Sequence, residues 1–583
     1  VYYRTKHRAG IANLTSSRRC VSAYFCIIAT VLILTGCSQS TKDYKKLADE
    51  ETYQAIDSTW KQTGIEKVDY DIDAYKSDLS VSIEDQLPPS GVLTLTDAVA
   101  FAIEHNRQYQ TQKENLYVKA LDLTLIRHAY HPNPFARTRL GFEKDNTRDI
   151  EGFSREATYG FSQLLETGTQ ISTSVAFAWV DILSGDFRSG FTTLLSATVK
   201  KPFLRGSSRN IVLENLTQAQ RDTLYQIRTF SRFRKEFVVS IIAKYYRVLQ
   251  QHDLAENARL NYDTLNRTYV QMEKFVSNGR LPKYELEQAH QDRLQAWDIS
   301  IEQEKLYQQM LDDFKIAMSI APTDNFKLDL NELDILANKT LSSPSFSADQ
   351  AIQTAMTSRL DLMNTADAIK DAERKIIVAK DLLRAELNLV VAGQTKTGLS
   401  SVKTKDSAID LGLELDLPVD RKAERNQYRK ALIVLDRQKR NHAQAADNIK
   451  HAIRQTHRDL TNAAEIYRLQ QESLKLADER FKSTSLLIQY NRANTRDVLD
   501  AQKDFFNAKN IATAALVDYT VAMLDFYRDA GVLQVKPDGM WQTHKMVDKL
   551  ALTNDNLTSL TKKKQTNPSE DAIKSWMKSQ TAR

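Results

Sequence analysis

Hydrophobic and polar residues alternate strictly over the segment Ile409–Leu417. Every odd position carries an aliphatic side chain, and the positions between them are acidic or glycine. A period of two predicts a β-strand with one apolar face and one polar face. Two environments suit such a strand: the half-buried sheet of a soluble protein, or a membrane barrel with lipid outside and water inside.

Further segments have strand-like patterns. They are Glu386–Gly398 in the same half of the chain, and Phe135–Lys144, Gly168–Trp179 and Ser196–Phe203 in the first half. The stretch from Gly168 to Phe203 is longer than a simple hairpin, so we expect an additional strand or a surface loop there. One chain with four or five such strands cannot close a barrel, and lipid does not tolerate an open sheet edge. Either several chains share the barrel, or the sheet is not in a membrane.

Two very long segments have the pattern of α-helices, because Ser207–Asn278 and Val419–Ala530 contain neither glycine nor proline. Apolar residues recur in them at spacings of three and four, which is the heptad seam of a coiled coil. The first seam is Ala255, Ala258, Tyr262, Leu265, Tyr269, Met272 and Val276. The second, with polar intrusions, is Ala463, Tyr467, Gln470, Leu474, Ala477, Phe481, Thr484 and Ile488. A helix from Ser207 to Asn278 would be about 108 Å long, so it must project from any compact body.

A short turn lies at the end of the first long segment and within the second. The turns are Asn278–Pro282 and Tyr490–Thr495. A returning helix follows each turn and ends near Ala321 or Gly531. We therefore expect two long helical hairpins in each chain.

The chain contains the same plan twice. An offset of 253 residues aligns Ala98 with Ala351, Ala102 with Ala355, Ile103 with Met356 and Tyr109 with Leu362. In the first copy we expect a helix that opens near Leu95, with Thr96 as its N-cap, and runs toward Ala129. Each copy continues through strands to a proline (Pro202, Pro418) and then into a long helix. Internal duplication indicates the architecture more strongly than any local motif. The expected fold class is therefore mainly α with β, in two similar halves.

The N-terminus has the features of an export signal. Residues 1–36 contain five basic residues and no acid, and the apolar run Val21–Leu34 is short for a permanent membrane helix. The run ends in Leu34-Thr35-Gly36-Cys37, which resembles the lipobox of bacterial lipoproteins. That resemblance implies acylation of Cys37, and Ser38 after it favours the outer membrane. The alternative is a signal anchor with an incidental cysteine.

These features predict the domain boundaries. They are a lipoprotein signal peptide at 1–36, a lipid-anchored N-terminal tether at 37–91, a first repeat at 92–335, a second repeat at 336–535 and a polar C-terminal tail at 536–583.

Charge and motifs point away from nucleic acid and from catalysis. The formal charge of +6 falls to +1 once the five basic residues of 1–36 are removed. Neither these residues nor the second local excess of basic residues, after Val535, is interleaved with aromatic residues, as a nucleic-acid surface usually is. The histidines lack metal-type spacing, and the chain has no phosphate-binding glycine loop and no nucleophile elbow. We expect no enzyme activity, no cofactor and no metal site.

The second hairpin turn supports a family assignment. The segments Asn491–Gln502 and Phe506–Lys509 resemble the turn and returning helix of the TolC family of outer-membrane efflux proteins. Pro202–Gly206 resembles the family's strand-to-helix junction, and Arg359–Leu362 resembles its second-repeat helix. The resemblance covers about Leu93 to Val535, and the motifs occur in order within a duplicated chain.

The resemblance implies a homotrimer in which each chain supplies four strands to a twelve-stranded outer-membrane barrel, continued by a coiled-coil tube across the periplasm. It implies an exit duct of a tripartite efflux or type I secretion system, served by an inner-membrane pump and a periplasmic adaptor. The cargo stays open among drugs, metal ions and a secreted protein. The alternative is a lipid-anchored periplasmic coiled-coil scaffold without a pore.

By position in the family, Asp497 and Asp500 would form carboxylate rings at a pore gate. The alternative is that these two acids only favour the N-terminus of the returning helix. The turn residues would dock the adaptor: Asn278, Gly279, Arg280, Leu281, Asn491, Arg492, Ala493, Asn494 and Thr495. The first turn departs from the family pattern, with Glu285 and Gln288 in place of an acidic pair, and Asn491 replaces the usual glycine of the second.

Overall fold

The structure, a computed structural model, is described for residues 40–73, 91–145, 150–182, 188–280, 282–338, 347–398, 406–417, 419–490 and 492–535. Residues 1–39, with Cys37 and the expected signal peptide, and the tail after Val535 lie outside the described residues. So do Leu281, Pro418 and Asn491.

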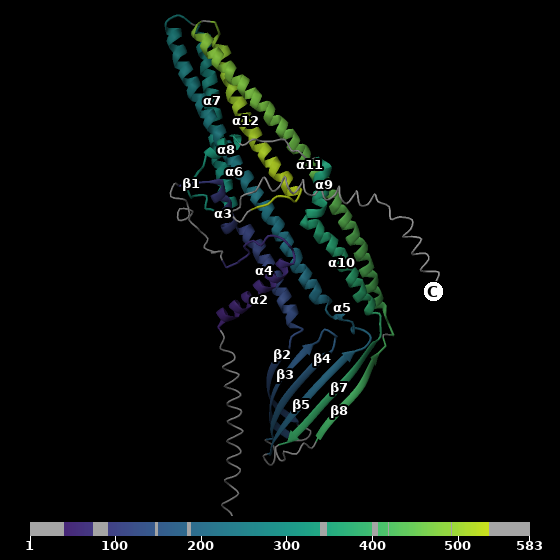
Figure 1. The fold of residues 1–583 in the computed structure, drawn as a ribbon. Coiled ribbons are helices and arrows are strands. Elements are labelled where there is room, and N and C mark those ends of the chain that lie inside the picture. The colour runs from purple at the N-terminus through teal and green to yellow at the C-terminus, as the bar shows by residue number, and fades with distance from the viewer. Residues whose placement is uncertain are drawn as a thin grey trace, which may run out of the picture.

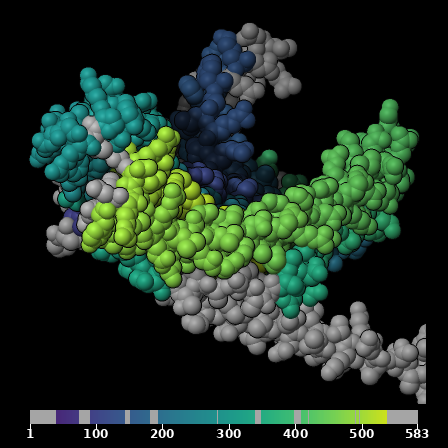
Figure 2. Space-filling view, turned by 90° about the horizontal axis from the view of Figure 1, so that it is seen from above, coloured from purple at the N-terminus to yellow at the C-terminus, as the bar shows by residue number. Residues whose placement is uncertain are grey.

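The molecule is elongated, with a sheet at one end and two helical hairpins at the other (Figure 1). The first hairpin consists of α6 (Glu214–Ser277) and α7 (Lys283–Met318), and the second of α11 (Lys422–Gln489) and α12 (Thr495–Asp529). At 64 residues, α6 is about 96 Å long. Both predicted turns separate these helices where the sequence places them. Seen from above, the chain is an open, bent wall in which the two hairpins lie side by side (Figure 2).

The duplication is confirmed by the helices that precede the strands. The first copy has α3 (Leu95–His105) and α4 (Arg107–His128), and the second has α9 (Ala348–Ser358) and α10 (Leu360–Asp381). Corresponding helices have equal lengths and keep the offset of 253 residues. The aligned alanines Ala98, Ala102, Ala351 and Ala355 are all fully buried. The repeated pattern therefore marks the surface with which each copy packs on its own long hairpin.

Two details of the first copy differ from the sequence prediction. The N-cap of α3 is Thr94 and not Thr96, since the Thr94 hydroxyl accepts a hydrogen bond from the Asp97 N–H at 3.2 Å. The expected single helix is divided at Asn106, whose amide donates to the carbonyl of Ala317 at 2.7 Å and whose Oδ1 accepts from the Tyr109 N–H. A contact with α7 thus sets the bend between α3 and α4.

The segment predicted as a tether contains a packed helix, α2 (Thr41–Lys61). Ile56 and Trp60 are buried in the main hydrophobic core, and the Trp60 ring stacks on Tyr70 with centroids 5.5 Å apart. The remaining short elements are α5 (Arg209–Val212), α8 (Asn331–Asn338) and a parallel pair formed by β1 (Val92–Leu93) and β6 (Lys327–Leu328). Much of the predicted tether is therefore part of the folded body.

The sheet has six antiparallel strands in the order β2-β3-β4-β5-β7-β8. Their bounds are β2 Asn133–Asp145, β3 Ile150–Leu164, β4 Gln170–Ile182, β5 Arg188–Pro202, β7 Glu386–Gly398 and β8 Asp406–Asp416. The four strands per chain that the family resemblance implies are therefore wrong. The five segments with strand-like patterns correspond to β2, β4, β5, β7 and β8, and the sixth strand, β3, lies before the stretch Gly168–Phe203 in which we expected an additional strand or loop. Three copies would bring eighteen strands, not twelve.

Tight glycine contacts join the sheet to the helices. Gly168 has φ +77°, and a Cβ at this position would lie 2.4 Å from the carbonyl oxygen of Gly206. The Gly206 N–H donates to the carboxylate of Asp381 at 2.7 Å. The junction after Pro202 therefore ties the β3–β4 turn and the end of α10 to one point, which fixes the sheet relative to the hairpins.

Candidate membrane sheet and hairpin tips

One face of the sheet is apolar and exposed. On β8, Ile409, Leu411 and Leu413 are 85%, 71% and 69% exposed. Leu411 and Leu413 pair with Val391 and Leu389 of β7, so the aliphatic side chains of both strands lie on the same face. A continuous aliphatic surface of this kind is unfavourable in water and needs an apolar covering.

The same face continues through the other four strands. The registers place on it Val199, Ala197 and Leu195 of β5; Ile171, Val175, Phe177 and Trp179 of β4; Phe161, Tyr159, Ala157 and Phe153 of β3; and Ala136, Leu140 and Phe142 of β2. The polar exceptions on this face are Arg155, Lys201 of β5, the ion pair of Lys144 and Glu151 at the far ends of β2 and β3, and a few hydroxyl or amide residues. A strand of about 9–11 residues crosses a bilayer, and these strands are 11 to 15 residues long.

The opposite face is polar. The charged side chains described on it are Arg137, Arg139, Glu156, Lys200, Glu386, Lys396, Asp410, Glu414 and Asp416. Lys200 contacts Glu414 at 2.8 Å and Glu386 at 3.8 Å, and Asn388 donates to both carboxylates. The Ser174 and Ser196 hydroxyls are hydrogen-bonded at 2.7 Å. This alternation of an apolar and a polar face is the pattern of a barrel wall between lipid and water.

The sheet does not close on itself. β2 pairs only with β3, and β8 pairs only with β7, among the residues that the structure describes. Each outer edge therefore has backbone N–H and C=O groups without a strand partner from the same chain. Within hydrocarbon, such groups would cost several kcal/mol each unless another strand paired with them.

The hairpin turns lie together at the end of the molecule farthest from the sheet (Figure 1). Gly279 has φ +67°, and the next N–H, that of Arg280, donates back to the carbonyl of Phe275 at 2.8 Å. Arg280, Arg492 and Asn494 are exposed. The structure thus places the described parts of both predicted docking turns at one tip.

Asp497 caps α12. Its carboxylate accepts a hydrogen bond from the Asn494 N–H at 3.0 Å, and the Asn494 side chain accepts from the Asp497 N–H in return. Asp500 lies one turn further along and is 3.8 Å from Arg496. Both acids are exposed. The geometry of Asp497 in the single chain is that of the helix-end alternative, and a ring of carboxylates needs further copies of the chain.

A third acid at the tip, Asp292 of α7, was not singled out in the sequence. Burial raises the pKa of Asp292, Lys503 lowers it, and the negative charge of Asp500 raises it further. The acidic field at the hairpin tips therefore comes from both hairpins. No pattern around Asp292 in the sequence indicates this, because α7 and α12 are brought together only by folding.

Buried polar contacts hold the two hairpins against each other. Asn257 of α6 is fully buried and donates to the Asn510 side chain of α12 at 2.7 Å. Gln502 of α12 is also buried and donates to Asn261 at 2.8 Å. Buried amides without these partners would lose hydrogen bonds to water, so the pairs fix the relative position of the hairpins.

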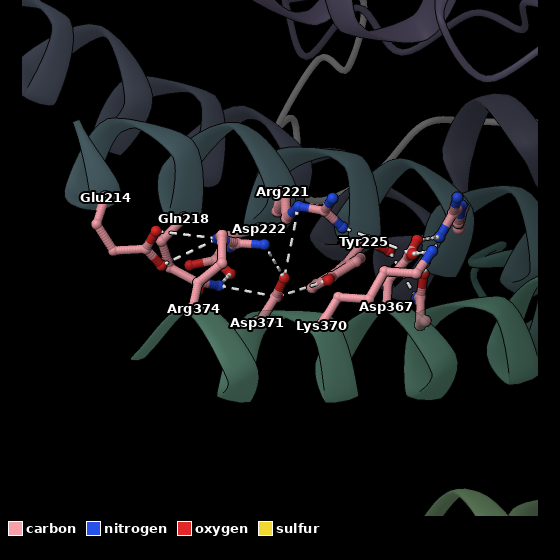
Figure 3. A network of polar contacts seen from close by, with 11 residues as sticks. Glu214, Gln218, Arg221, Asp222, Tyr225, Asp367, Lys370, Asp371 and Arg374 are labelled. Carbon is pink, nitrogen blue, oxygen red and sulfur yellow. Dashed lines mark hydrogen bonds and ion pairs between the residues drawn. The ribbon is translucent and has the colours of Figure 1, made fainter. Parts of the chain in front are cut away.

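A charged ladder joins the two repeats nearer the sheet (Figure 3). The helices α6 and α10 are antiparallel, so the start of α6 lies beside the later part of α10. At one end of the ladder Arg374 contacts Glu214 at 2.9 Å, and toward the other end Arg228 contacts Asp367 at 2.8 Å. Between them, Tyr225 donates to the buried Asp371 at 2.6 Å.

The ladder favours the charged form of Asp367, which is partly buried. Burial acts to raise the pKa of Asp367, but hydrogen bonds from Arg228 and Lys370 outweigh it and hold the pKa below its usual value. The sequence carries a partial signal for this ladder, since Arg221, Arg228 and Arg232 recur at helical spacing. Their partners cannot be found without the fold.

Two classes of site are absent from the part of the chain that the structure describes. No helix there is both long and apolar enough to cross a membrane. No cluster of three or more histidine, cysteine or acidic side chains there could hold a metal ion.

Comparison of the fold with solved structures finds outer-membrane channels. The chain matches CusC with a TM-score of 0.56 and 13% identity, over 75% of this chain and 92% of that one; the CusC structure describes transmembrane channel formation. It matches the CmeC outer membrane channel of Campylobacter jejuni with a TM-score of 0.55 and 14% identity, over 78% and 88% of the two chains. It matches the outer membrane protein VceC of Vibrio cholerae with a TM-score of 0.55 and 12% identity, over 75% and 96%.

No family model and no curated protein sequence matches the chain. The likeness therefore lies in the fold, which is TolC-like, as the sequence motifs predict.

Proposed function

We propose that this chain, with its TolC-like fold, is the outer-membrane exit duct of a tripartite efflux or type I secretion system. The observation that carries the proposal is the sheet, whose apolar face extends through all six strands and whose two edges are both open. Several copies that join these edges enclose a polar lumen and present the apolar face to lipid, as a membrane barrel requires. The proposed assembly is a homotrimer, as the resemblance to the TolC family implies.

The helical hairpins continue the duct into the periplasm. They extend from the sheet by the length of α6, about 96 Å. The tips, with Asn278–Arg280 on one hairpin and Arg492–Thr495 on the other, are the docking surface for a periplasmic adaptor that links the duct to an inner-membrane pump. Substrates pass through the duct passively, and the pump supplies the free energy.

The proposed location is the outer membrane, with the acylated Cys37 as a second attachment beside the barrel. Two or three acyl chains bind a membrane stably, because each buried CH₂ contributes about 0.8 kcal/mol. The chain then needs no membrane-spanning helix.

A periplasmic scaffold without a pore is the second candidate. The long hairpins and the expected lipid anchor suit it equally well. It gives no reason for Ile409, Leu411 and Leu413 to be largely exposed on a sheet whose opposite face is charged. The apolar face of the sheet therefore favours the duct.

Planar-bilayer recording of the purified, detergent-solubilised protein tests the proposal. We expect stepwise increases in conductance, because each inserted assembly adds one water-filled path. The sample's helical content, measured by circular dichroism, confirms that the chain is folded. A folded sample that associates with the bilayer but never conducts would refute the duct and support the scaffold.

A further inference from the structure

The two open edges of the sheet match each other in direction. The sheet has six antiparallel strands, so its first strand, β2, and its last, β8, run in opposite directions. When a second copy is placed beside the first, its β2 lies antiparallel to β8 of the first copy. An even number of strands in each chain is what a closed antiparallel barrel requires.

The edge of β8 is acidic on the polar face, and the first half of β2 is basic. β2 has Arg137 and Arg139 there, whereas the register puts Glu143 and Asp145 on the same face near its other end; β8 has Asp410, Glu414 and Asp416. Among the described residues, both arginines, Asp410 and Asp416 form no ion pair, whereas Glu414 contacts Lys200. Like charges in one row repel each other, and opposite charges across neighbouring strands attract.

The apolar faces also become continuous when the edges meet. Ile409, Leu411 and Leu413 of β8 then lie beside Leu140 and Phe142 of β2, all of them exposed in the single chain. Apart from Ser407 at its start, β8 thus presents only aliphatic side chains to lipid at the junction of two chains, and the arginines and carboxylates of the junction face water. Charge and polarity both select β2 of another copy as the partner of β8.

We infer that β8 of one copy pairs with β2 of the next through this arginine–carboxylate seam, and that three copies of the six-stranded sheet close an eighteen-stranded barrel. This inference rests on the proposed function, since it assumes a trimeric duct. The diameter of a barrel grows roughly in proportion to its strand number, so this barrel is about one and a half times as wide as the twelve-stranded barrel of the family. The duct accordingly admits bulkier or more hydrated cargo at its outer end.

The seam has a small set of possible registers. Side chains that pair across antiparallel strands share a face, so registers that keep the arginines on the polar face differ by steps of two residues. Four successive registers place Arg137 opposite Asp410, Arg139 opposite Asp410, Arg137 opposite Glu414 and Arg139 opposite Glu414. Each of them brings an arginine directly opposite a carboxylate.

Disulfide trapping in the full-length protein tests the seam. Four double variants combine Arg137→Cys or Arg139→Cys with Asp410→Cys or Glu414→Cys, and each is oxidised in membranes and analysed on a denaturing gel. We expect one of the four to give covalent species of two and three chains. The single-cysteine variants are the controls, and the natural cysteines all lie at or before Cys37.

The results separate the seam from the proposed function. If none of the double variants forms linked chains while the protein still conducts in a planar bilayer, the seam is wrong and the duct stands. If the protein neither links nor conducts, the proposed function fails with it. Linked chains in an assembly whose electron microscopy map shows eighteen strands would establish the barrel, and a map with twelve would overturn it.

Charge reversal tests the electrostatic part of the inference. Arg137→Asp with Arg139→Asp places acids on both edges, so we expect loss of the oligomer in native gels. Adding Asp410→Arg and Asp416→Arg restores opposite charges and should restore the oligomer. If the variant with Arg137→Asp and Arg139→Asp alone assembles as well as the natural protein, the charges do not select β2 as the partner of β8.

Discussion

Asp497 shows how one carboxylate can have a local role and a proposed role in the assembly. In the single chain it accepts the Asn494 N–H and so completes a reciprocal cap of α12. The same side chain is exposed at the tip, where a ring of copies would gather negative charge. Asp500 lies beyond the cap, forms a long, exposed contact with Arg496, and acts on Asp292 through its charge. The two positions therefore need variants that remove charge and keep hydrogen-bonding capacity.

We predict that Asp497→Asn combined with Asp500→Asn weakens block of the channel by divalent cations, because the ring loses its negative charge. The half-blocking concentration should rise about tenfold, which corresponds to about 1.4 kcal/mol of binding free energy. The asparagine at position 497 can still accept a hydrogen bond from the Asn494 N–H, so α12 should still begin at the same residue. Single-channel recording with added divalent cation measures the effect.

Glu285→Gln is the matched control, because Glu285 lies in the first turn of the other returning helix. It should change the block less. Equal block in the double variant and the natural protein would remove both acids from the gate and leave Asp497 as a helix cap only.

Among the elements, β3 shows why a strand can be missed. Phe153, Ala157, Tyr159 and Phe161 do alternate with polar residues, but Arg155 interrupts their row. The neighbouring strands β2 and β4 supply the hydrogen bonds and the apolar surroundings that place β3 in the sheet. For β7, the structure confirms the predicted bounds Glu386–Gly398.

Two adjacent residues of β7 allow a test of which face meets lipid. Val391 pairs with Leu411 on the apolar face, and Ala392 pairs with Asp410 on the polar face. We predict that Val391→Lys destabilises the membrane-inserted protein by about 2–4 kcal/mol, because its ammonium group would face hydrocarbon. Ala392→Lys should insert normally and shift ion selectivity toward anions.

The amount of protein in outer-membrane fractions and the reversal potential in a salt gradient measure the two effects. The opposite result, with Ala392→Lys lost from the membrane and Val391→Lys tolerated, would invert the assignment of the faces. Equal tolerance of both variants would place the sheet outside the membrane.

For the molecule as a whole, the sheet and the expected lipid anchor offer two separate attachments to the membrane. A scaffold would depend on the anchor alone, whereas a duct is held by its barrel as well. The folded helix α2 places the start of the described chain against the body, with Ile56 and Trp60 in the main core. The anchor is thus close in sequence to a fixed point on the protein.

We predict that Cys37→Ala, which removes the acylation site, leaves the protein in the membrane fraction after extraction at alkaline pH. Lipid contact over six strands is far larger than that of a few acyl chains. Immunoblotting of the soluble and membrane fractions measures the outcome, with the unaltered protein as control. Release of the folded Cys37→Ala protein into the soluble fraction would favour the scaffold.

Local periodicity was sufficient for the features that each segment sets through its own backbone. The two hairpins, their turns after Ser277 and Gln489, the duplicated helices and the bounds of β7 all follow from spacings of two, three and four residues. These spacings reflect the geometry of a strand or helix and need no knowledge of its neighbours.

Folding decided whatever depends on a partner distant in sequence. The division at Asn106 needs the carbonyl of Ala317, and β3 needs the strands on both sides of it. The charges of Arg139 and Asp410 could be interpreted as a contact between copies only once the sheet order had placed them on opposite outer edges. A residue pattern states which face a side chain shares with its near neighbours, but the element that covers that face is chosen by three-dimensional packing.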